Sequence, residues 1–320
     1  MRARGDSLSS LLKKKDIILA PGAYDALSAR LIAGQGFPAV YLTGYGTTAS
    51  MLARPDIGFI TLPDMCSVVR NISQVVDVPL IADAESGFGN AVNLVRTVRE
   101  YEMAGASAIH LEDQVVPRRY GGESTPPVVP LEEHAARIRL ACGARRSSEF
   151  LIIGRTDCIQ RLGLDEAIRR ANAYGAAGAD VLFVHGISTR DELREVGRSV
   201  AGPKLVNYSA LTLSAQADPA SIPELSEWGY SIVIFAIEPL FAAVRGMKEA
   251  LAAFGRADRR TASPAPVLRK LMVGRGELEE SLDVREYERL GEEALPRRAE
   301  RELRDDDERR DDDERRDARP

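Results

Sequence analysis

The sequence predicts an α/β protein built as a (β/α)8 TIM barrel with additional C-terminal helices. Three observations lead to this prediction: eight short apolar runs, segments with helical spacing between them, and glycines placed before several runs. Most of the runs lack polar alternation, as expected for parallel strands that are covered on both sides. Strands that alternate with amphipathic helices are typical of parallel βα units. Eight such units suit a closed barrel, although seven would also fit the pattern.

Each predicted element follows from a local pattern. The runs that we assign to strands are 17–20, 39–43, 79–82, 108–111, 150–154, 181–184, 204–206 and 231–235. Apolar residues at helical intervals mark 26–33, 90–104 and 165–176, which precede the second, fourth and sixth runs. Glycines within 33–36, 104–106 and 177–179 are expected to end helices just before strands.

The strand pattern stops after about residue 255, so the sequence predicts three regions. Residues 1–255 form the barrel, and residues 256–300 form helices outside it, because 267–295 keeps apolar helical spacing. Residues 301–320 form a charged tail, in which 304–316 repeats the letters DDDERR without an apolar residue. We expect this tail to be disordered, since it cannot bury enough surface to offset its ordering entropy. An interaction tail is the alternative.

The composition argues against several classes of protein. The 320 residues carry 48 acidic and 43 basic side chains, a formal net charge of −5, so we expect no nucleic-acid partner. The apolar runs, such as 232–237, are far shorter than the roughly 20 residues that span a bilayer. The N-terminal segment lacks the apolar stretch of a signal peptide. Three cysteines without close pairs argue against a disulfide framework and favour a reducing cytoplasm.

Acidic residues follow two neighbouring strands, at the end of the barrel where such enzymes carry their sites. Asp83 and Glu85 are two residues apart after the third strand, where an extended chain would point both to one side. Glu112 follows the fourth strand. Converging carboxylates repel unless a cation lies between them, and oxygen ligands favour Mg²⁺ or Mn²⁺. We therefore predict a divalent metal site, with a solvated acidic surface as the alternative.

The segment 43–47, Thr-Gly-Tyr-Gly-Thr, follows the second strand. Its two glycines let backbone N–H groups approach a ligand closely, and its threonines add hydroxyl donors. Such donors suit a carboxylate or an enolate oxygen. An ordinary glycine turn is the alternative interpretation.

Further polar candidates follow the later strands. Arg155 suits bidentate binding of a substrate carboxylate or an ion pair with the acids. His185 suits hydrogen bonding or proton transfer near neutral pH, with a packed histidine as the alternative. Asn207 is a weaker candidate for substrate binding. His110 lies inside an apolar run and is expected in the core, whereas His134 lies in a polar helical stretch and is expected at the surface.

Several motifs occur in order along about residues 20–254. They are PGAYDALSARL (21–31), TGYGTTASMLARPD (43–56), ADAESGFGN (82–90), HLEDQVVPRRYGG (110–122), GRTD (154–157) and GLDEAIRRANAYGAAGADVLF (163–183). Together they resemble the isocitrate lyase/phosphoenolpyruvate mutase superfamily, both its methylisocitrate lyase-like and its carboxyphosphonoenolpyruvate phosphonomutase-like members. The resemblance implies a Mg²⁺-dependent enzyme that acts on a 2-oxo or 2-hydroxy acid and forms or consumes a pyruvate-like enolate.

The resemblance also implies roles for individual residues. Those that would ring the metal, largely through waters, are Asp83, Glu85, Glu112 and Asp56. Those that would hold the carboxylate end of the substrate are Thr43, Gly44, Tyr45 and, opposite them, Arg155. The resemblance further implies a homotetramer in which neighbouring subunits exchange C-terminal helices, and a homodimer is the smaller alternative.

Two departures from the superfamily pattern bear on the chemistry. Residues 83–85 read Asp-Ala-Glu where the superfamily usually has Asp-Ala-Asp. The loop 118–122 reads Arg-Arg-Tyr-Gly-Gly, without the Cys and His of the isocitrate and methylisocitrate lyases and without the Lys-x-Asn-Ser of the phosphonopyruvate branch. Tyr120 then becomes the candidate proton donor of this loop, although its ordinary pKa near 10 makes it a weaker acid than Cys. His185, in contrast, resembles the phosphonopyruvate branch.

The leading hypothesis is a Mg²⁺-dependent lyase or decarboxylase that breaks or forms a C–C bond in a small 2-oxo or 2-hydroxy dicarboxylic acid. In it His185 or Tyr120 handles a proton, and Arg155 clamps a carboxylate. The alternatives are P–C chemistry, as in a phosphonopyruvate hydrolase or phosphonomutase, and a barrel that has lost catalysis.

Overall fold

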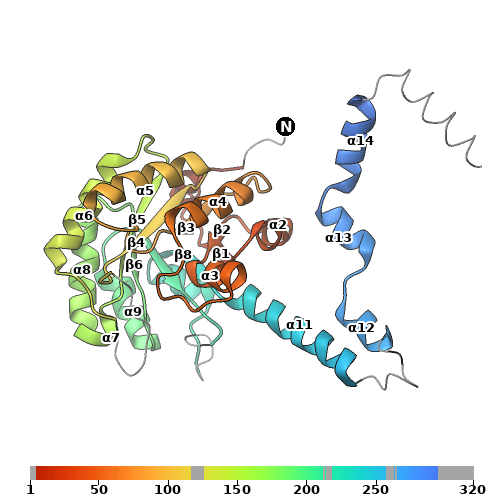
Figure 1. The fold of residues 1–320 in the computed structure, drawn as a ribbon. Coiled ribbons are helices and arrows are strands. Elements are labelled where there is room, and N and C mark those ends of the chain that lie inside the picture. Colours follow the sequence, from red (N-terminus) through yellow and green to blue (C-terminus); the bar gives the residue numbers. More distant parts are fainter. Residues whose placement is uncertain are drawn as a thin grey trace, which may run out of the picture. The chain divides into compact units, whose positions relative to one another are not determined.

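The structure is a computed structural model, and it describes residues 5–116, 126–211, 213, 218–256, 263 and 265–294. Eight parallel strands pair in sequence order and close into a barrel (Figure 1). The strands are β1 (Ile18–Ala23), β2 (Val40–Leu42), β3 (Leu80–Asp83), β4 (Ala108–Glu112), β5 (Leu151–Thr156), β6 (Val181–Val184), β7 (Lys204–Asn207) and β8 (Tyr230–Phe235). This confirms the predicted fold class and eight strands rather than seven.

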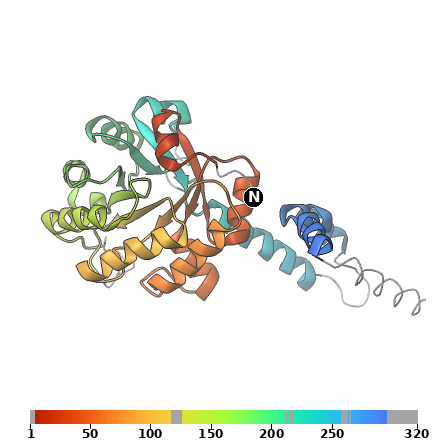
Figure 2. The same ribbon diagram turned by 90° about the horizontal axis from the view of Figure 1, so that it is seen from above.

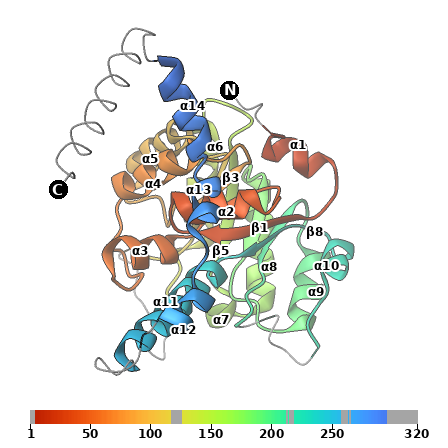
Figure 3. The same cartoon turned by 90° about the vertical axis from the view of Figure 1, so that its right-hand side faces the viewer.

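Helices surround the strands, as the view from above shows (Figure 2). Those of residues 1–249 are α1 (Leu8–Lys13), α2 (Ala26–Gly34), α3 (Gly44–Leu52), α4 (Leu62–Ser73), α5 (Ala91–Ala104), α6 (Leu131–Ala144), α7 (Ile159–Leu162), α8 (Leu164–Ala176), α9 (Arg190–Ser199), α10 (Ile222–Glu227) and the start of α11 (Glu238–Arg256). The helices α8, α9 and α10 pack side by side (Figure 3).

Local signals in the sequence explain where α5 begins and ends. The Asn90 side chain accepts hydrogen bonds from the backbone N–H groups of Val92 and Asn93, which would otherwise lack partners at a helix start. Gly105 ends the helix in the left-handed region, with φ = 104°, where side chains are disfavoured. Gly178 plays the same part after α8, with φ = 106°. The glycine-terminated helices that the sequence predicts are therefore present.

Two apolar clusters explain why the strands lack polar alternation. One cluster fills the barrel with side chains such as Tyr41, Ile81 and Phe183, and Leu8 of α1 joins it. The other lies between the strands and the surrounding helices. Successive residues of a strand face opposite sides, so both faces of these strands are buried.

The expectation for His134 is wrong, because this side chain is buried. Its Nε2 lies 3.2 Å from the backbone oxygen of Leu111, and its ring packs edge-on against Tyr174. Burial lowers the pKa of His134 to about 3. Neighbours in the sequence point away from one another on a helix, so the polar Glu132 and Glu133 say little about the face that carries His134.

The chain divides into two compact units, residues 1–249 and 250–320. The division falls within α11, whereas the sequence predicts a boundary at residue 255, which stays a prediction. The second unit contains α12 (Ala265–Leu271), α13 (Arg275–Ser281) and α14 (Val284–Ala294). The tail 301–320 lies outside the described residues. Among those that are described, no helix has both the length and the apolar character needed to cross a membrane.

Candidate active site

The predicted polar residues gather at the carboxyl ends of the strands. Asp83 is the last residue of β3 and Glu112 the last of β4, while Arg155 is the last but one of β5. The strand register pairs Glu112 directly with Arg155, and Asp83 with His110. Closure of the barrel therefore brings residues that are more than 25 positions apart to one edge.

The carboxylates of Asp83 and Glu85 converge beside Gly44. A Cβ atom at residue 44 would lie 2.7 Å from both Asp83 Oδ2 and Glu85 Oε1. Both acids are buried. The predicted convergence is present, but its cause is not strand alternation: Glu85 lies beyond β3 in the left-handed region, with φ = 51°. The Glu85 N–H donates to Asp83 Oδ1 at 2.9 Å and holds this turn closed.

The segment 43–47 forms the start of a helix and not the glycine turn that was the alternative interpretation. Thr43 caps α3, and its Oγ1 accepts a hydrogen bond from Gly46 N–H at 3.2 Å. The first N–H of the helix, on Gly44, donates to Asp83 Oδ2 at 3.3 Å. A helix N-terminus carries partial positive charge, which suits the neighbouring carboxylates or a bound anion. Tyr45 is partly exposed and packs against Phe241.

Arg155 is a buried cation beside two carboxylates and an aromatic ring. Its Nη2 lies 3.2 Å from Glu112 Oε2 and 2.8 Å from Asp157 Oδ1, and its guanidinium lies over the Phe183 ring. Burial alone would lower the pKa of Arg155, but the charges of Asp157 and Glu112 raise it well above its ordinary value. In the part of the chain that is described, Arg155 Nε donates no hydrogen bond, so it remains for a ligand.

Asp157 links Arg155 to His185. Its Oδ1 lies 2.6 Å from His185 Nδ1, and the His185 side chain is about one third exposed, at 37%. Burial alone would raise the pKa of Asp157, but Arg155 and His185 lower it well below the ordinary value. The sequence interpretation gave Asp157 no role. Its spacing of two residues from Arg155 along an extended chain is a signal that could have found it.

His110 is buried as expected, directly behind the acid pair. Its Nε2 lies 2.8 Å from the Tyr41 hydroxyl and 3.7 Å from Asp83 Oδ1. Burial lowers the pKa of His110 to about 4. The imidazole is therefore neutral near pH 7 and adds no charge to the site.

Another buried carboxylate, that of Asp113, points away from the acid pair and anchors the end of β5. It accepts hydrogen bonds from the side chains of Thr156, Tyr174 and Arg170 and from the backbone N–H of Asp157. These bonds fix the chain on which Arg155 and Asp157 lie. The sequence interpretation assigned Glu112 to the metal site and gave Asp113 no role. The two side chains point in different directions because neighbouring residues of an extended chain face opposite sides.

The structure assigns no site role to three of the predicted residues. Asp56 is buried in the connection between α3 and α4, and its part in a metal site stays a prediction. Asn207 ends β7, with its Oδ1 outside any hydrogen bond to the described residues. Tyr120 lies outside the described residues, so its role also stays a prediction.

The donor set around Gly44 fits a hard divalent cation with few protein ligands. Asp83 Oδ2 and Glu85 Oε1 both lie beside Gly44, where any larger side chain would clash with them. Among the described residues, no group of three or more His, Cys, Asp or Glu side chains could hold a metal ion. Mg²⁺ usually keeps several waters and takes one or two protein carboxylates, so the pair suits Mg²⁺ better than it suits Zn²⁺.

Comparison with known proteins identifies the family of the chain. Residues 8–254 match the family described as phosphoenolpyruvate phosphomutase. The chain is 39% identical over 240 residues to 2,3-dimethylmalate lyase from Eubacterium barkeri, covering 75% of this chain and 82% of the lyase.

Two solved structures share the fold. A crystal structure of 2,3-dimethylmalate lyase, described as a PEP mutase/isocitrate lyase superfamily member, gives a TM-score of 0.77 at 34% identity and covers 90% of this chain and 96% of that one. Phosphonopyruvate hydrolase in complex with oxalate and Mg²⁺ gives 0.78 at 29% identity, with 90% and 98% covered. The protein therefore belongs to the phosphoenolpyruvate mutase/isocitrate lyase superfamily.

Proposed function

We propose that this protein is a Mg²⁺-dependent lyase that cleaves or forms a C–C bond in a small 2-oxo or 2-hydroxy dicarboxylic acid. The observation that carries the proposal is the convergence of Asp83 and Glu85 beside Gly44, next to the buried cation of Arg155. Like charges at such short range are costly without a cation. The similarity to 2,3-dimethylmalate lyase supports C–C rather than P–C chemistry.

The residues that would surround the metal, largely through waters, are Asp83, Glu85 and Glu112, with Asp56 joining through a water. A bound Mg²⁺ would act as a Lewis acid and stabilise negative charge on a substrate oxygen. Mn²⁺ has the same preference for oxygen ligands. Glycine at residue 44 is compatible with this arrangement, because any larger side chain would meet both carboxylates.

Groups of the protein itself would bind the substrate and move its protons. Breaking the C–C bond of a 2-oxo acid leaves its electron pair on an enolate oxygen, and the enolate carbon then takes up a proton. A 2-hydroxy acid must first lose its hydroxyl proton. Arg155 Nε and the Tyr45 N–H at the start of α3 would bind the substrate carboxylate, and the Gly44 N–H would join them on turning from Asp83 Oδ2 to the substrate.

His185 would move the proton. Asp157 accepts from Nδ1, so the proton of a neutral ring lies on Nδ1 and Nε2 carries the lone pair. That arrangement suits a base for the hydroxyl proton, and the protonated ring could return a proton to carbon. Tyr120 is the alternative proton donor.

Two other functions remain as alternatives. The similarity to phosphonopyruvate hydrolase supports P–C cleavage, and the sequence around His185 resembles that branch. A barrel without activity is the third, supported by the absence of Cys and His in the loop 118–122. The two buried carboxylates that converge beside Gly44 argue against it, since clustered like charges cost stability in a purely structural protein.

The test measures products and binding together. Dicarboxylic 2-oxo and 2-hydroxy acids, and phosphonopyruvate, are incubated with protein and Mg²⁺, with formation of 2-oxo acid and of phosphate followed separately. We expect 2-oxo acid formation that stops on chelation and returns with Mg²⁺. Arg155→Met should lower kcat/KM by about 10²-fold or more, whereas Arg169→Met, at an exposed ion pair with Glu166, should not.

The alternatives give different results. Phosphate release from phosphonopyruvate without any C–C cleavage would replace the lead proposal by P–C chemistry. Absence of Mg²⁺-dependent oxalate binding in calorimetry would leave only the inactive barrel.

We further propose a homotetramer, or at the least a homodimer, located in the cytoplasm and without nucleic-acid or membrane partners. The three cysteines are free thiols, which is compatible with a reducing compartment. Light scattering of the full chain would test the oligomeric state.

A further inference from the structure

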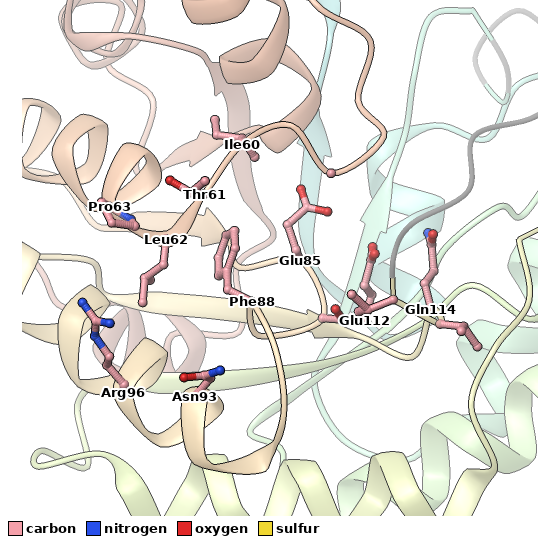
Figure 4. Close-up of a pocket in the computed structure, with 14 residues that line it drawn as sticks. Ile60, Thr61, Leu62, Pro63, Glu85, Phe88, Asn93, Arg96, Glu112 and Gln114 are labelled. Carbon is pink, nitrogen blue, oxygen red and sulfur yellow. The ribbon is translucent and has the colours of Figure 1, made fainter.

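A cavity of about 430 Å³ adjoins two of the proposed metal ligands, and its lining mixes polar and apolar side chains. Glu85, Glu112 and Gln114 line it together with apolar residues such as Leu62 and Phe88 (Figure 4). A water molecule takes up roughly 30 Å³ in the liquid, so the cavity has room for a substrate substituent of several non-hydrogen atoms. Which substituent fits best then depends on the polar groups that the cavity offers.

Gln114 brings to this cavity a buried amide whose oxygen lacks a hydrogen bond. The residue is 4% exposed, and its Oε1 accepts no hydrogen bond from any of the described residues. Buried side-chain oxygens in folded proteins nearly always have a donor, because an unpaired one costs stability. An unpaired oxygen beside a proposed metal site remains available to a ligand.

The backbone holds Gln114 in place without the help of its side chain. Gln114 pairs with Val128 in an isolated antiparallel bridge. The backbone N–H of the next residue, Val115, donates to Pro127 O at 2.9 Å. The amide is therefore presented to the cavity from a fixed segment, which lowers the ordering cost of binding a ligand.

The direction of the Gln114 side chain follows from its distance to Glu112 in the chain. The two residues are two positions apart, so an extended chain places both side chains on the same side. Asp113 lies between them and points to the other side, where it accepts from the Thr156 hydroxyl at 2.7 Å. Gln114 thus belongs to the face of the segment that carries a proposed metal ligand.

An unpaired acceptor selects a ligand group that carries a hydrogen-bond donor. Neither a methyl group nor an ionised carboxylate has one. A carboxylate would also meet the like charges of Glu85 and Glu112, and the one cationic side chain among the described lining residues, Arg96, is mostly exposed and lies 3.8 Å from Glu100. An ammonium group has donors but would compete with the metal for the two acids. A hydroxyl group is the smallest neutral donor.

We propose that Gln114 is a specificity residue that accepts a hydrogen bond from a hydroxyl substituent of the substrate. The substrate would then be a 2-oxo or 2-hydroxy acid with a further hydroxyl group on the part that enters the cavity. This inference rests on the proposed function, since it needs the acid head of the substrate beside Asp83 and Glu85. An analogue with a methyl group in place of that hydroxyl leaves the Gln114 oxygen unpaired and should bind about tenfold or more weakly.

The probes are two N-substituted oxamates that differ in one group. N-(2-hydroxyethyl)oxamate and N-propyloxamate share the 2-oxo acid head, and the terminal hydroxyl of the first replaces the terminal methyl of the second. In both, nitrogen takes the place of the carbon that would become the enolate carbon, so the proposed lyase cannot cleave them. Calorimetry with Mg²⁺ measures their affinities, with oxalate as the reference for the head group. We expect the unaltered protein to bind the hydroxyethyl compound about tenfold or more tightly than the propyl compound.

Gln114→Met removes the amide and keeps the length of the side chain. Gln74→Met is the matched control, because Gln74 follows α4, is exposed and does not line the cavity. In Gln114→Met the preference should vanish or turn to the propyl compound, which gains from apolar burial, while oxalate binding stays within about twofold. Gln74→Met should keep the full preference. Urea unfolding should show that Gln114→Met is as stable as the unaltered protein, since the Gln114 oxygen has no donor among the described residues.

Each other outcome overturns a stated claim. If oxalate binds but the unaltered protein does not prefer the hydroxyethyl compound, the hydroxyl site is refuted and the proposed function stands. If Gln114→Met keeps the preference, another group recognises the hydroxyl; if Gln114→Met is clearly less stable, the amide has a partner within the protein. Either result refutes the role of Gln114. If neither oxalate nor either oxamate binds with Mg²⁺, the proposed function fails, and the hydroxyl site fails with it.

Discussion

Replacing Gly44 by alanine tests the metal site with the addition of one carbon atom. The new Cβ would lie 2.7 Å from Asp83 Oδ2 and from Glu85 Oε1, and 3.0 Å from Asp83 Cγ. The two carboxylates would have to retreat by roughly half an ångström to relieve contacts this short, because folded interiors have little free space. Metal–ligand distances tolerate only about 0.2 Å. We therefore expect Gly44→Ala to weaken Mg²⁺ binding by about 10- to 100-fold, as changes around metal ligands commonly do.

The fold should tolerate the same substitution. The atoms in the way are the ends of flexible side chains, and alanine in a helix is favoured over glycine by up to about 1 kcal/mol. Gly143→Ala is the matched control: Gly143 lies in α6, and its Cβ would meet nothing within 4 Å. Denaturant unfolding should show both variants within about 1 kcal/mol of the unaltered protein.

Calorimetric titration with Mg²⁺, alone and with oxalate, measures the effect. We expect the loss of affinity in Gly44→Ala and not in Gly143→Ala. If Gly44→Ala binds Mg²⁺ as tightly as the unaltered protein, the ion does not lie between Asp83 and Glu85, and the proposed mechanism loses its basis. Equal losses in both variants would show that the effect is not local to the acid pair.

Three further predictions concern buried polar groups. Asp157→Asn removes the negative charge that contacts both Arg155 and His185. We expect kcat to fall by about 10²-fold or more and the free energy of unfolding to fall by roughly 2–3 kcal/mol. Unchanged kinetics would remove His185 from the mechanism. Burial lowers the pKa of His134 to about 3, so below about pH 6.5 the unfolded chain binds a proton that the folded protein rejects. As the pH falls below about 6.5, the free energy of unfolding should therefore decrease by up to about 1.4 kcal/mol per pH unit. Urea unfolding at several pH values should show a smaller decrease for His134→Gln. Asp113→Asn turns an acceptor of four hydrogen bonds into a partial donor and should cost about 3 kcal/mol in urea unfolding; a loss below 1 kcal/mol would contradict its anchoring role.

The sequence by itself determined the barrel and the chain positions of its site. Each βα unit leaves a local pattern: apolar runs for doubly covered strands, helical spacing for the outer layer, and glycine at helix ends such as Gly105. Because all parallel strands end at one edge of a closed barrel, polar residues after the runs had to meet there. Asp83, Glu112 and Arg155 were predictable for this reason.

Only the tertiary structure decided which way individual side chains point. Glu85 reaches Asp83 through a left-handed turn, not through strand alternation. Asp113 turns from the acid pair to anchor β5, although it adjoins Glu112 in the chain. His134 is buried by α8 despite polar neighbours. In each case the direction of a side chain depends on register and packing between segments far apart in sequence, which local periodicity does not encode.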